Sequence, residues 1–238
     1  MSIQPSSPSV VLLDIEGTTL PVAFVHKVLF PYARRTLPDL IRTQADNPVV
    51  AQALEEIRAA APGRDPMEQL TAWMDADAKV APLKALQGLA WAEGYASGEL
   101  VATLFADVPA ALRTWKDAGL TLAVYSSGSA PAQRLIYGHT TDGDLTPLFD
   151  AFLDLEMGGK KESASYRAIL THEGWQATDV LFVSDVVAEL DAAREAGLRT
   201  CQMVRPEDGT VAGDRHPVAH SLDDVARLFH LPDPASRT

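Results

Sequence analysis

The feature that most constrains the fold is a regular alternation of short apolar runs and helix-like segments after residue 105. The expected strands cover residues 120–125, 149–155, 180–183 and 199–204. The expected helices cover residues 109–118, a segment from 131, 162–172, 187–196 and 222–229. Strands that alternate with helices pair in parallel, and the helices cover both faces of the sheet. The pattern therefore predicts an α/β fold with a doubly wound, mostly parallel sheet.

The first 105 residues predict an interruption of this fold. Residues 10–13 form an apolar run that ends at Asp14 and predicts the first strand. From residue 24 to 105 helical periodicity dominates and strand-like runs are absent. Prolines interrupt this region at positions 38, 48, 62, 66 and 82. We expect an α/β core of residues 8–22 and 106–230, with a helical cap domain inserted at residues 23–105.

Composition limits the partners of the chain. The formal net charge is −12, and no cluster of lysines and arginines offers a basic face, so a nucleic-acid partner is not expected. No apolar stretch approaches a membrane span and the first nine residues do not resemble a signal peptide, so we expect a cytoplasmic protein without a membrane partner. We also expect a monomer. Cys201 is the only cysteine, and its apolar neighbours predict a core residue.

Four polar clusters follow the expected strands or lie between them. They are Asp14 to Thr19, Ser126 to Ser129, Gly159 to Lys161, and the pair Ser184 and Asp185. The carboxyl ends of parallel strands open onto one edge of a sheet, so these groups are expected to converge. Each cluster has a simpler reading as a turn or a helix cap when it is taken alone. Their occurrence together, in this order, favours a site.

The residue types in these clusters fit phosphoryl transfer. The carboxylate of Asp14 can attack phosphorus and form an aspartyl phosphate. Asp14, Asp185 and either the main chain or the side chain of Glu16 offer the oxygen ligands that a hard divalent cation needs. Ser126 or Ser127 can hold the phosphoryl oxygens, and Lys160 adds positive charge against them. The metal and the lysine would supply the local positive charge that the acidic chain otherwise lacks.

Longer motifs carry a resemblance to a known family. DIEGTT, YSSGS, a downstream lysine and a strand that ends in SD resemble the haloacid-dehalogenase superfamily of phosphatases. The chain is more closely similar to the enolase-phosphatase family of methionine salvage, also called acireductone synthases, through FVHKVLFPYA, LKALQG, GHTTDGD and KESASY. These motifs run from Val10 to about residue 196. The resemblance implies a haloacid-dehalogenase-like core with a cap.

The resemblance also implies roles for individual residues. Members bind Mg²⁺ and convert the phosphorylated diketone 2,3-diketo-5-methylthiopentyl-1-phosphate, by enolisation and then dephosphorylation, into a dihydroxy-ketone. The matching positions are Asp14 as nucleophile and metal ligand, Glu16 as the second acid and general acid/base, Ser126 and Ser127 at the substrate phosphate, Lys160 as the motif lysine, and Asp185 as a metal ligand. Lys84 is expected to contact the diketone from the cap.

Several alternatives remain open in the sequence. Lys161 competes with Lys160 for the position of the motif lysine. The last motif of the superfamily often has two acids, but here Asp185 is followed by three apolar residues and Glu189 stands four residues on. Whether Glu189 helps to hold Asp185 or a metal-bound water is open. Lys84 and Gln87 also fit an exposed amphipathic helix, and His26 fits a packing residue better than a base.

Three rival functions differ in class. One is a capped phosphatase that acts on another small phosphate ester without enolising it. A dehalogenase is disfavoured because it needs neither Glu16 nor magnesium. A catalytically silent binding module is disfavoured because it has no need for Asp14, Glu16, Lys160 and Asp185 together.

Overall fold

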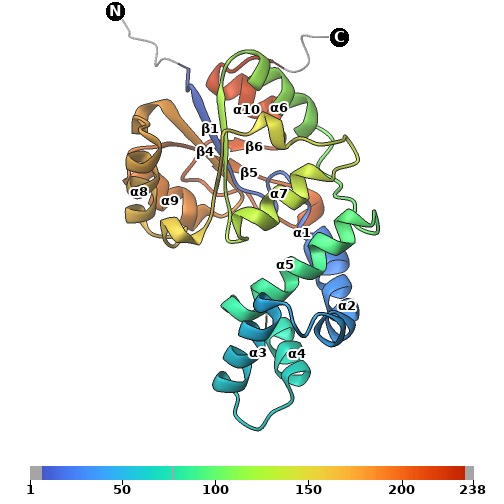
Figure 1. Ribbon diagram of the computed structural model, residues 1–238. Helices are drawn as coiled ribbons and strands as arrows, with labels where there is room; N and C mark the ends of the chain where they lie inside the picture. Colours follow the sequence, from blue (N-terminus) through green and yellow to red (C-terminus); the bar gives the residue numbers. More distant parts are fainter. Residues whose placement is uncertain (1–6, 77, 234–238) are drawn as a thin grey trace, which may run out of the picture. The chain divides into compact units, whose positions relative to one another are not determined.

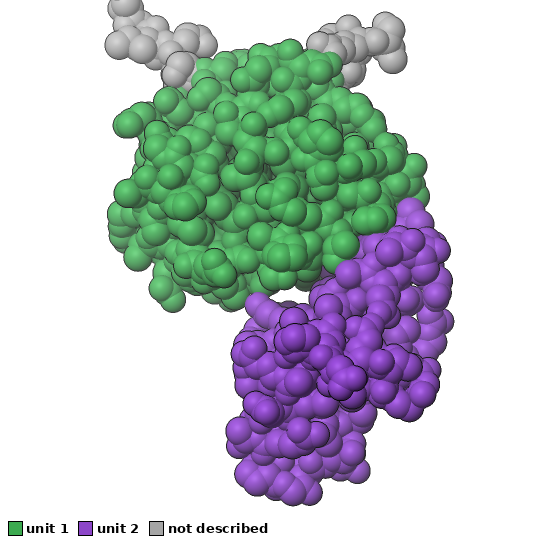
Figure 2. All heavy atoms as spheres, in the orientation of Figure 1, with its two compact units in different colours: residues 1–22, 102–238 green, residues 23–101 purple. Residues whose placement is uncertain are grey.

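The computed structural model describes residues 7–76 and 78–233. The chain divides into two compact units, one of Met1–Val22 and Ala102–Thr238 and one of Ala23–Val101 (Figure 2). The second boundary therefore precedes the expected position, residue 106, by a few residues. The reason is that the segment after residue 101 hydrogen-bonds within the first unit: the amide of Ala102 donates to the carbonyl of His139, and the amide of Phe105 donates to the carbonyl of Thr19.

The first unit is built on a six-stranded parallel sheet (Figure 1). Its strands lie in the order β3-β2-β1-β4-β5-β6. Their bounds are β1 Val10–Leu13, β2 Thr121–Tyr125, β3 Ala151–Leu153, β4 Val180–Ser184, β5 Arg199–Met203 and β6 Val218–Ala219. All five pairings are parallel, which confirms the predicted fold class. The third strand is shorter than predicted, and β6 has only two residues, too few to leave a period in the sequence.

Helices cover both faces of this sheet. Helices α8 and α9 pack on one face, and α6, α7 and α10 lie on the other (Figure 1). Their bounds are α6 Val108–Asp117, α7 Ala130–Gly138, α8 Ser163–Glu173, α9 Val187–Glu195 and α10 Leu222–Phe229. Short 3₁₀ turns occupy Thr146–Leu148, Leu155–Met157, Ala177–Asp179 and Pro206–Asp208. The sheet is thus buried on both faces, as its nearly continuous apolar strands predict.

The regular elements among the described residues of the second unit are all helices. Helix α1, Val22–Phe24, begins at the boundary, and a π-helical turn, Val25–Leu29, leads into α2. The remaining helices are α2 Phe30–Thr43, α3 Pro48–Ala60, α4 Pro66–Asp75 and α5 Ala81–Ala96. Leu37, Ile57, Leu70 and Leu86 meet in its core.

Proline marks the start of several of these helices. Pro48 and Pro66 stand at the first position of α3 and α4, where proline costs no hydrogen bond. The expectation that Pro38 interrupts the helical pattern is wrong, because Pro38 lies inside α2. Burial of Leu37 and Leu40 on the inner face of α2 offsets the hydrogen bond that Pro38 removes.

The first unit brings the polar clusters to one edge of the sheet. Asp14 follows β1, Ser126 follows β2 and Asp185 follows β4, and these three strands are neighbours. Their carboxyl ends therefore lie side by side. Within the described part of the chain, no helix is both long enough and apolar enough to cross a membrane.

Candidate active site

The carboxylate of Asp14 is buried and fully oriented. Its Oδ1 accepts hydrogen bonds from the amide of Ile15 at 2.8 Å and from Lys160 Nζ at 2.6 Å. Its Oδ2 lies 3.1 Å from the hydroxyl of Ser184. Hydrogen bonds to a carboxylate are among the strong ones, so these donors fix the side chain in one orientation. The carboxylate is held at the carboxyl end of β1.

Lys160 is the lysine that reaches this carboxylate. Its Nζ lies 2.6 Å from Asp14 Oδ1 and 2.7 Å from Glu189 Oε2. Burial by itself lowers the pKa of the ammonium, but the two carboxylates outweigh this effect and raise the pKa of Lys160 above its ordinary value. Lys160 is therefore charged at neutral pH. Lys161 is exposed, so the structure distinguishes the two lysines that the sequence left open.

Glu189 contacts the motif lysine. It lies in the first turn of α9, forms an ion pair with Lys160, and its Oε2 is 3.1 Å from the Ser184 hydroxyl. Burial, and next the charge of Asp14, raises the pKa of Glu189. Glu189 thus holds the lysine, a contact that the sequence did not indicate, and its support of a metal-bound water stays an open question.

Asp185 has a buried oxygen without a hydrogen-bond partner. Its Oδ1 has no donor within the described residues, and no side chain caps α9, so the helix-cap reading of Asp185 is wrong. Burial, with further contributions from Asp14 and Glu189, raises the pKa of Asp185 to about 7. A buried carboxylate oxygen without a partner is costly unless a cation or another donor meets it.

Gly17 brings the loop after β1 against Asp185. A Cβ atom at this position would lie 2.6 Å from Asp185 Oδ2, and the backbone φ angle of +71° disfavours a side chain as well. Glycine is therefore required for the close approach of the two strand ends.

The charges of the site fit a divalent cation. The carboxyl groups of Asp14, Asp185 and Glu189 interact with one another, and the Lys160 ammonium lies against two of them. With all three carboxyls ionised, as a bound cation would favour, the group carries an excess of two negative charges. Among the residues described, no three His, Cys, Asp or Glu side chains meet in a metal-holding group. Asp14 and Asp185 could hold a metal here together with the main chain or the side chain of Glu16, because a hard divalent cation needs oxygen ligands.

The serine cluster follows β2 in a compact turn. Ser126 is buried, and its hydroxyl accepts a hydrogen bond from the amide of Gly128 at 3.2 Å. Ser127 is half-buried, and Ser129 accepts the amide of Ala132 at the start of α7. The side chain of Gln133 holds the turn, since its Nε2 donates to the carbonyls of Gly128 and Leu153, both at 2.8 Å.

The candidates in the second unit lie in helices of that unit. Lys84 is half-buried in α5, and Gln87, one turn further, is buried, so this face of α5 is not simply exposed. His26 is exposed and its ring meets the edge of Phe30 at 5.4 Å between centroids, which agrees with a packing role. The predicted contact of Lys84 with substrate stays a prediction.

Sequence reasoning missed two residues that build the site. Ser184 was grouped with Asp185 but given no role, although its hydroxyl lies between Asp14 and Glu189. Arg205 was not considered. Its guanidinium donates to the carbonyl of Thr18 in the loop after β1 and forms a bidentate ion pair with the carboxylate of Asp107. For Ser184 the available signal was a polar residue at the end of the otherwise apolar strand β4, whereas β5, which precedes Arg205, already contains Arg199, Thr200 and Gln202 and gave no such signal.

The chain has close relatives of known family. A family model for haloacid dehalogenase-like hydrolases matches residues 8–197. Enolase-phosphatase E1 of Gluconacetobacter diazotrophicus is 68% identical over 222 residues, which cover 93% of this chain and 94% of the relative. Enolase-phosphatase E1 of Acidiphilium cryptum is 54% identical over 228 residues, covering 96% and 98%. The chain belongs to the enolase-phosphatase E1 family.

Solved structures agree with this family. UTR4 protein from Saccharomyces cerevisiae, known from a crystal structure, is 34% identical in sequence and superposes with a TM-score of 0.77. The match covers 90% of this chain and 98% of the UTR4 chain. A 2-haloacid dehalogenase from Pseudomonas syringae, at 21% identity and a TM-score of 0.59, shares the fold. The resemblance read from the motifs is confirmed. Enolase-phosphatases are haloacid dehalogenase-like hydrolases, and phosphatases of this type generally depend on a metal ion.

Proposed function

We propose that the chain converts 2,3-diketo-5-methylthiopentyl-1-phosphate to the dihydroxy-ketone acireductone and phosphate. Family membership and relatives named enolase-phosphatase support the activity. The observation that carries it is the buried Asp14 carboxylate, held by Lys160 and Ser184 next to Asp185. An anion so placed suits a nucleophile that attacks phosphorus. The cytoplasmic location expected from the sequence stays a prediction.

The dephosphorylation step follows from these residues. An oxygen of the Asp14 carboxylate attacks phosphorus, the bond from phosphorus to the ester oxygen breaks, and Glu16 gives a proton to the leaving oxygen. Glu16 then takes a proton from the water that attacks the aspartyl phosphate, which releases phosphate and regenerates Asp14. Lys160 and the turn at Ser126 and Ser127 stabilise the negative charge on the phosphoryl oxygens.

Magnesium is the metal that we assign to this site. Asp14, Asp185 and the main-chain oxygen of Glu16 would hold it, because Mg²⁺ prefers a few carboxylate and carbonyl oxygens together with water. The unpartnered Asp185 Oδ1 and the excess negative charge support this choice. When bound, Mg²⁺ supplies positive charge to the enediolate and to the phosphoryl group. The helical unit of residues 23–101 is proposed as the cap that closes over the substrate, with Lys84 on its α5 helix.

The two half-reactions separate in two variants. Asp14→Asn removes the nucleophile, and we expect phosphate release to fall by at least about a thousandfold while the enol still forms. Lys84→Ala is expected to slow enol formation and to spare hydrolysis of p-nitrophenyl phosphate. Ultraviolet absorbance of the enol and released phosphate are measured together. Activity of Asp14→Asn within tenfold of the wild type would overturn the assignment of Asp14, and equal losses of both rates in Lys84→Ala would overturn that of Lys84.

The same assay tests the second candidate function. A phosphatase of the same fold that acts on another small ester would hydrolyse p-nitrophenyl phosphate but give no enol absorbance from the diketone. Appearance of the enol in the wild type, with phosphate released after it, excludes this alternative.

A further inference from the structure

Three hydroxyl groups hold three consecutive carbonyls of the loop that carries Lys160. We call residues 158–162 the lysine loop. Tyr125 donates to the carbonyl of Gly158 at 2.7 Å, Ser165 to that of Gly159 at 2.8 Å, and Tyr166 to that of Lys160 at 2.7 Å. Side-chain hydrogen bonds to three successive main-chain carbonyls fix the path of the backbone residue by residue.

The three donors stand on rigid elements. Tyr125 is the last residue of β2, next to the serine turn, and Ser165 and Tyr166 lie in the first turn of α8. All three side chains are at most 2% exposed. The rings of Tyr125 and Tyr166 meet edge to face at 5.6 Å, and Tyr166 packs on Phe182 of β4 at 5.3 Å. Packing in the core therefore fixes the orientation of the two tyrosine rings and the positions of their hydroxyls.

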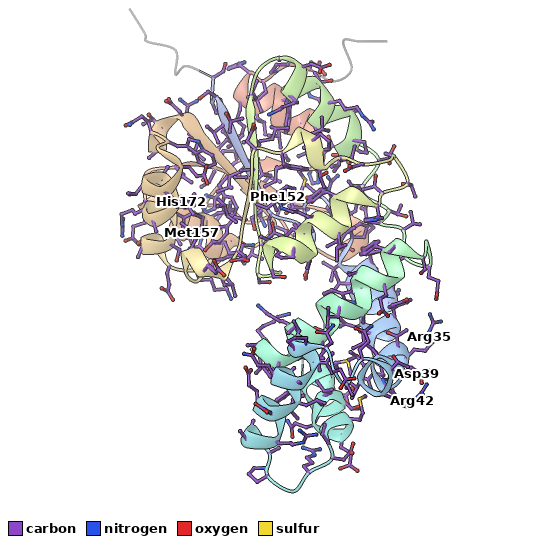
Figure 3. The ribbon with its side chains drawn as sticks, in the orientation of Figure 1. Arg35, Asp39, Arg42, Phe152, Met157 and His172 are labelled. Atoms are coloured by element: carbon purple, nitrogen blue, oxygen red, sulfur yellow. The ribbon has the colours of Figure 1, made fainter. Side chains whose placement is uncertain are left out.

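The backbone of the lysine loop packs closely against the residues that bind it. Gly158 has a φ angle of +114°, and a Cβ atom there would lie 2.3 Å from the Ser165 hydroxyl. Met157, labelled in Figure 3, precedes the loop and packs against the core cluster that contains Tyr125 and Tyr166. The loop is thus packed onto the hydroxyls that bind it.

The Lys160 ammonium, which this loop carries, is also held by short contacts. Lys160 Nζ lies 2.6 Å from Asp14, 2.7 Å from Glu189 and 5.9 Å from the centre of the Tyr125 ring. The side chain of Lys160 reaches both short contacts from a main chain that the three hydroxyls hold. The position of the charge therefore depends on the path of the loop.

We propose that Tyr125, Ser165 and Tyr166 are positioning residues that set the Lys160 ammonium between Asp14 and Glu189. The role for catalysis rests on the phosphatase activity proposed above. Tyr125 also joins the lysine loop to the strand that ends in the serine turn, so one residue fixes the lysine and the phosphate cradle relative to each other.

The test uses Tyr166→Phe, Tyr125→Phe and Ser165→Ala, singly and together, in the full chain with magnesium. Each change removes one hydroxyl and keeps the packing. We expect kcat for p-nitrophenyl phosphate to fall about tenfold in each tyrosine variant and about a hundredfold in the triple variant, the scale of loss for a misplaced catalytic group. The inhibition constant of orthovanadate, which mimics the five-coordinate phosphorus, should rise in proportion.

The vanadate constant separates positioning from stability. A loss of folded protein lowers the apparent kcat but leaves an inhibition constant unchanged, because that constant does not depend on the amount of active enzyme. Thr140→Val is the matched control, since it removes a buried hydroxyl that donates to the carbonyl of Gly143 at 2.6 Å in the same unit. The control is expected to lower the melting temperature and to leave both constants unchanged.

The outcomes are distinct. Variants that lose thermal stability as Thr140→Val does, but keep the wild-type kcat and vanadate constant, overturn the positioning role. A wild type that hydrolyses no phosphate ester overturns the proposed function instead. In that case crystal structures still test the inference: the distance from Lys160 Nζ to Asp14 must lengthen in the triple variant, and an unchanged distance refutes it.

Discussion

Arg205 gives the sharpest test of how the loop after β1 is held. Its side chain is 4% exposed, and that of its partner Asp107 is 13% exposed. The guanidinium donates to both oxygens of Asp107, at 2.8 and 2.9 Å, and to the carbonyls of Thr18 and His220. It also lies over the ring of Phe105 at 4.1 Å. Arg205 therefore joins the loop after β1 to the segment of residues 102–107.

Arg205→Met removes the cation and keeps an apolar side chain of similar length. The carboxylate of Asp107 keeps the amide of Leu222 as a donor at 2.7 Å but loses its buried counter-ion. Breaking a buried ion pair by removing one partner costs about 3–5 kcal/mol. Since domains are stable by about 5–15 kcal/mol, the variant should fold but unfold at a clearly lower urea concentration. Arg205→Lys keeps the charge but not the planar guanidinium that donates to both Asp107 oxygens, and its free energy of unfolding should fall less than that of Arg205→Met.

Cys201 makes the measurement specific to the first unit. It is the only cysteine and is buried in β5, so brief thiol labelling at increasing urea concentration reports the opening of this sheet. Arg167→Met is the control, because Arg167 and Glu195 form an exposed pair at 3.7 Å, with exposed fractions of 53% and 71%. Such a pair contributes at most about 1 kcal/mol. A loss in Arg205→Met no larger than that of the control would refute the reasoning.

Three further predictions concern the metal, the thiol and the assembly. Excess chelator should abolish turnover, and calcium should inhibit because it prefers a looser, higher coordination; full activity in chelator would contradict the metal assignment. Burial, and next the charge of Asp224, raises the pKa of Cys201 to about 12, so the native thiol should not react with a disulfide reagent at about pH 8 and should react fully in concentrated urea. Light scattering should give the mass of one chain, 25.6 kDa, and twice that mass would refute the monomer.

The fold was predictable because its signal is local. Most strands and helices of the first unit begin and end within a residue or two of the expected positions, since apolar runs and helical periods record burial directly. The two-residue strand β6 and the continuation of α2 through Pro38 were not predictable, because tertiary packing decides both. Hydrophobic periodicity in the sequence does not report contacts between distant segments.

The site was predictable only in part. The order of the motifs placed Asp14, Ser126, Lys160 and Asp185 at one edge of the sheet, because parallel topology brings strand ends together. The pairing of Glu189 with Lys160 depends on side chains from different segments, and so does the support of the lysine loop by Tyr125 and Tyr166. Sequence distance carries no information about these contacts.

The identity of the nucleophile is the central claim, and trapping the phosphorylated enzyme tests it most directly. Wild-type protein with magnesium and a phosphate ester is quenched in acid during turnover and digested. The masses of its peptides are then measured by mass spectrometry. We predict one added phosphoryl group on the peptide that contains Asp14, and its absence in Asp14→Asn. A phosphoryl group on Ser126 or Ser127, or an unmodified Asp14 peptide under conditions that trap the intermediate of a related aspartyl phosphatase, would contradict the claim.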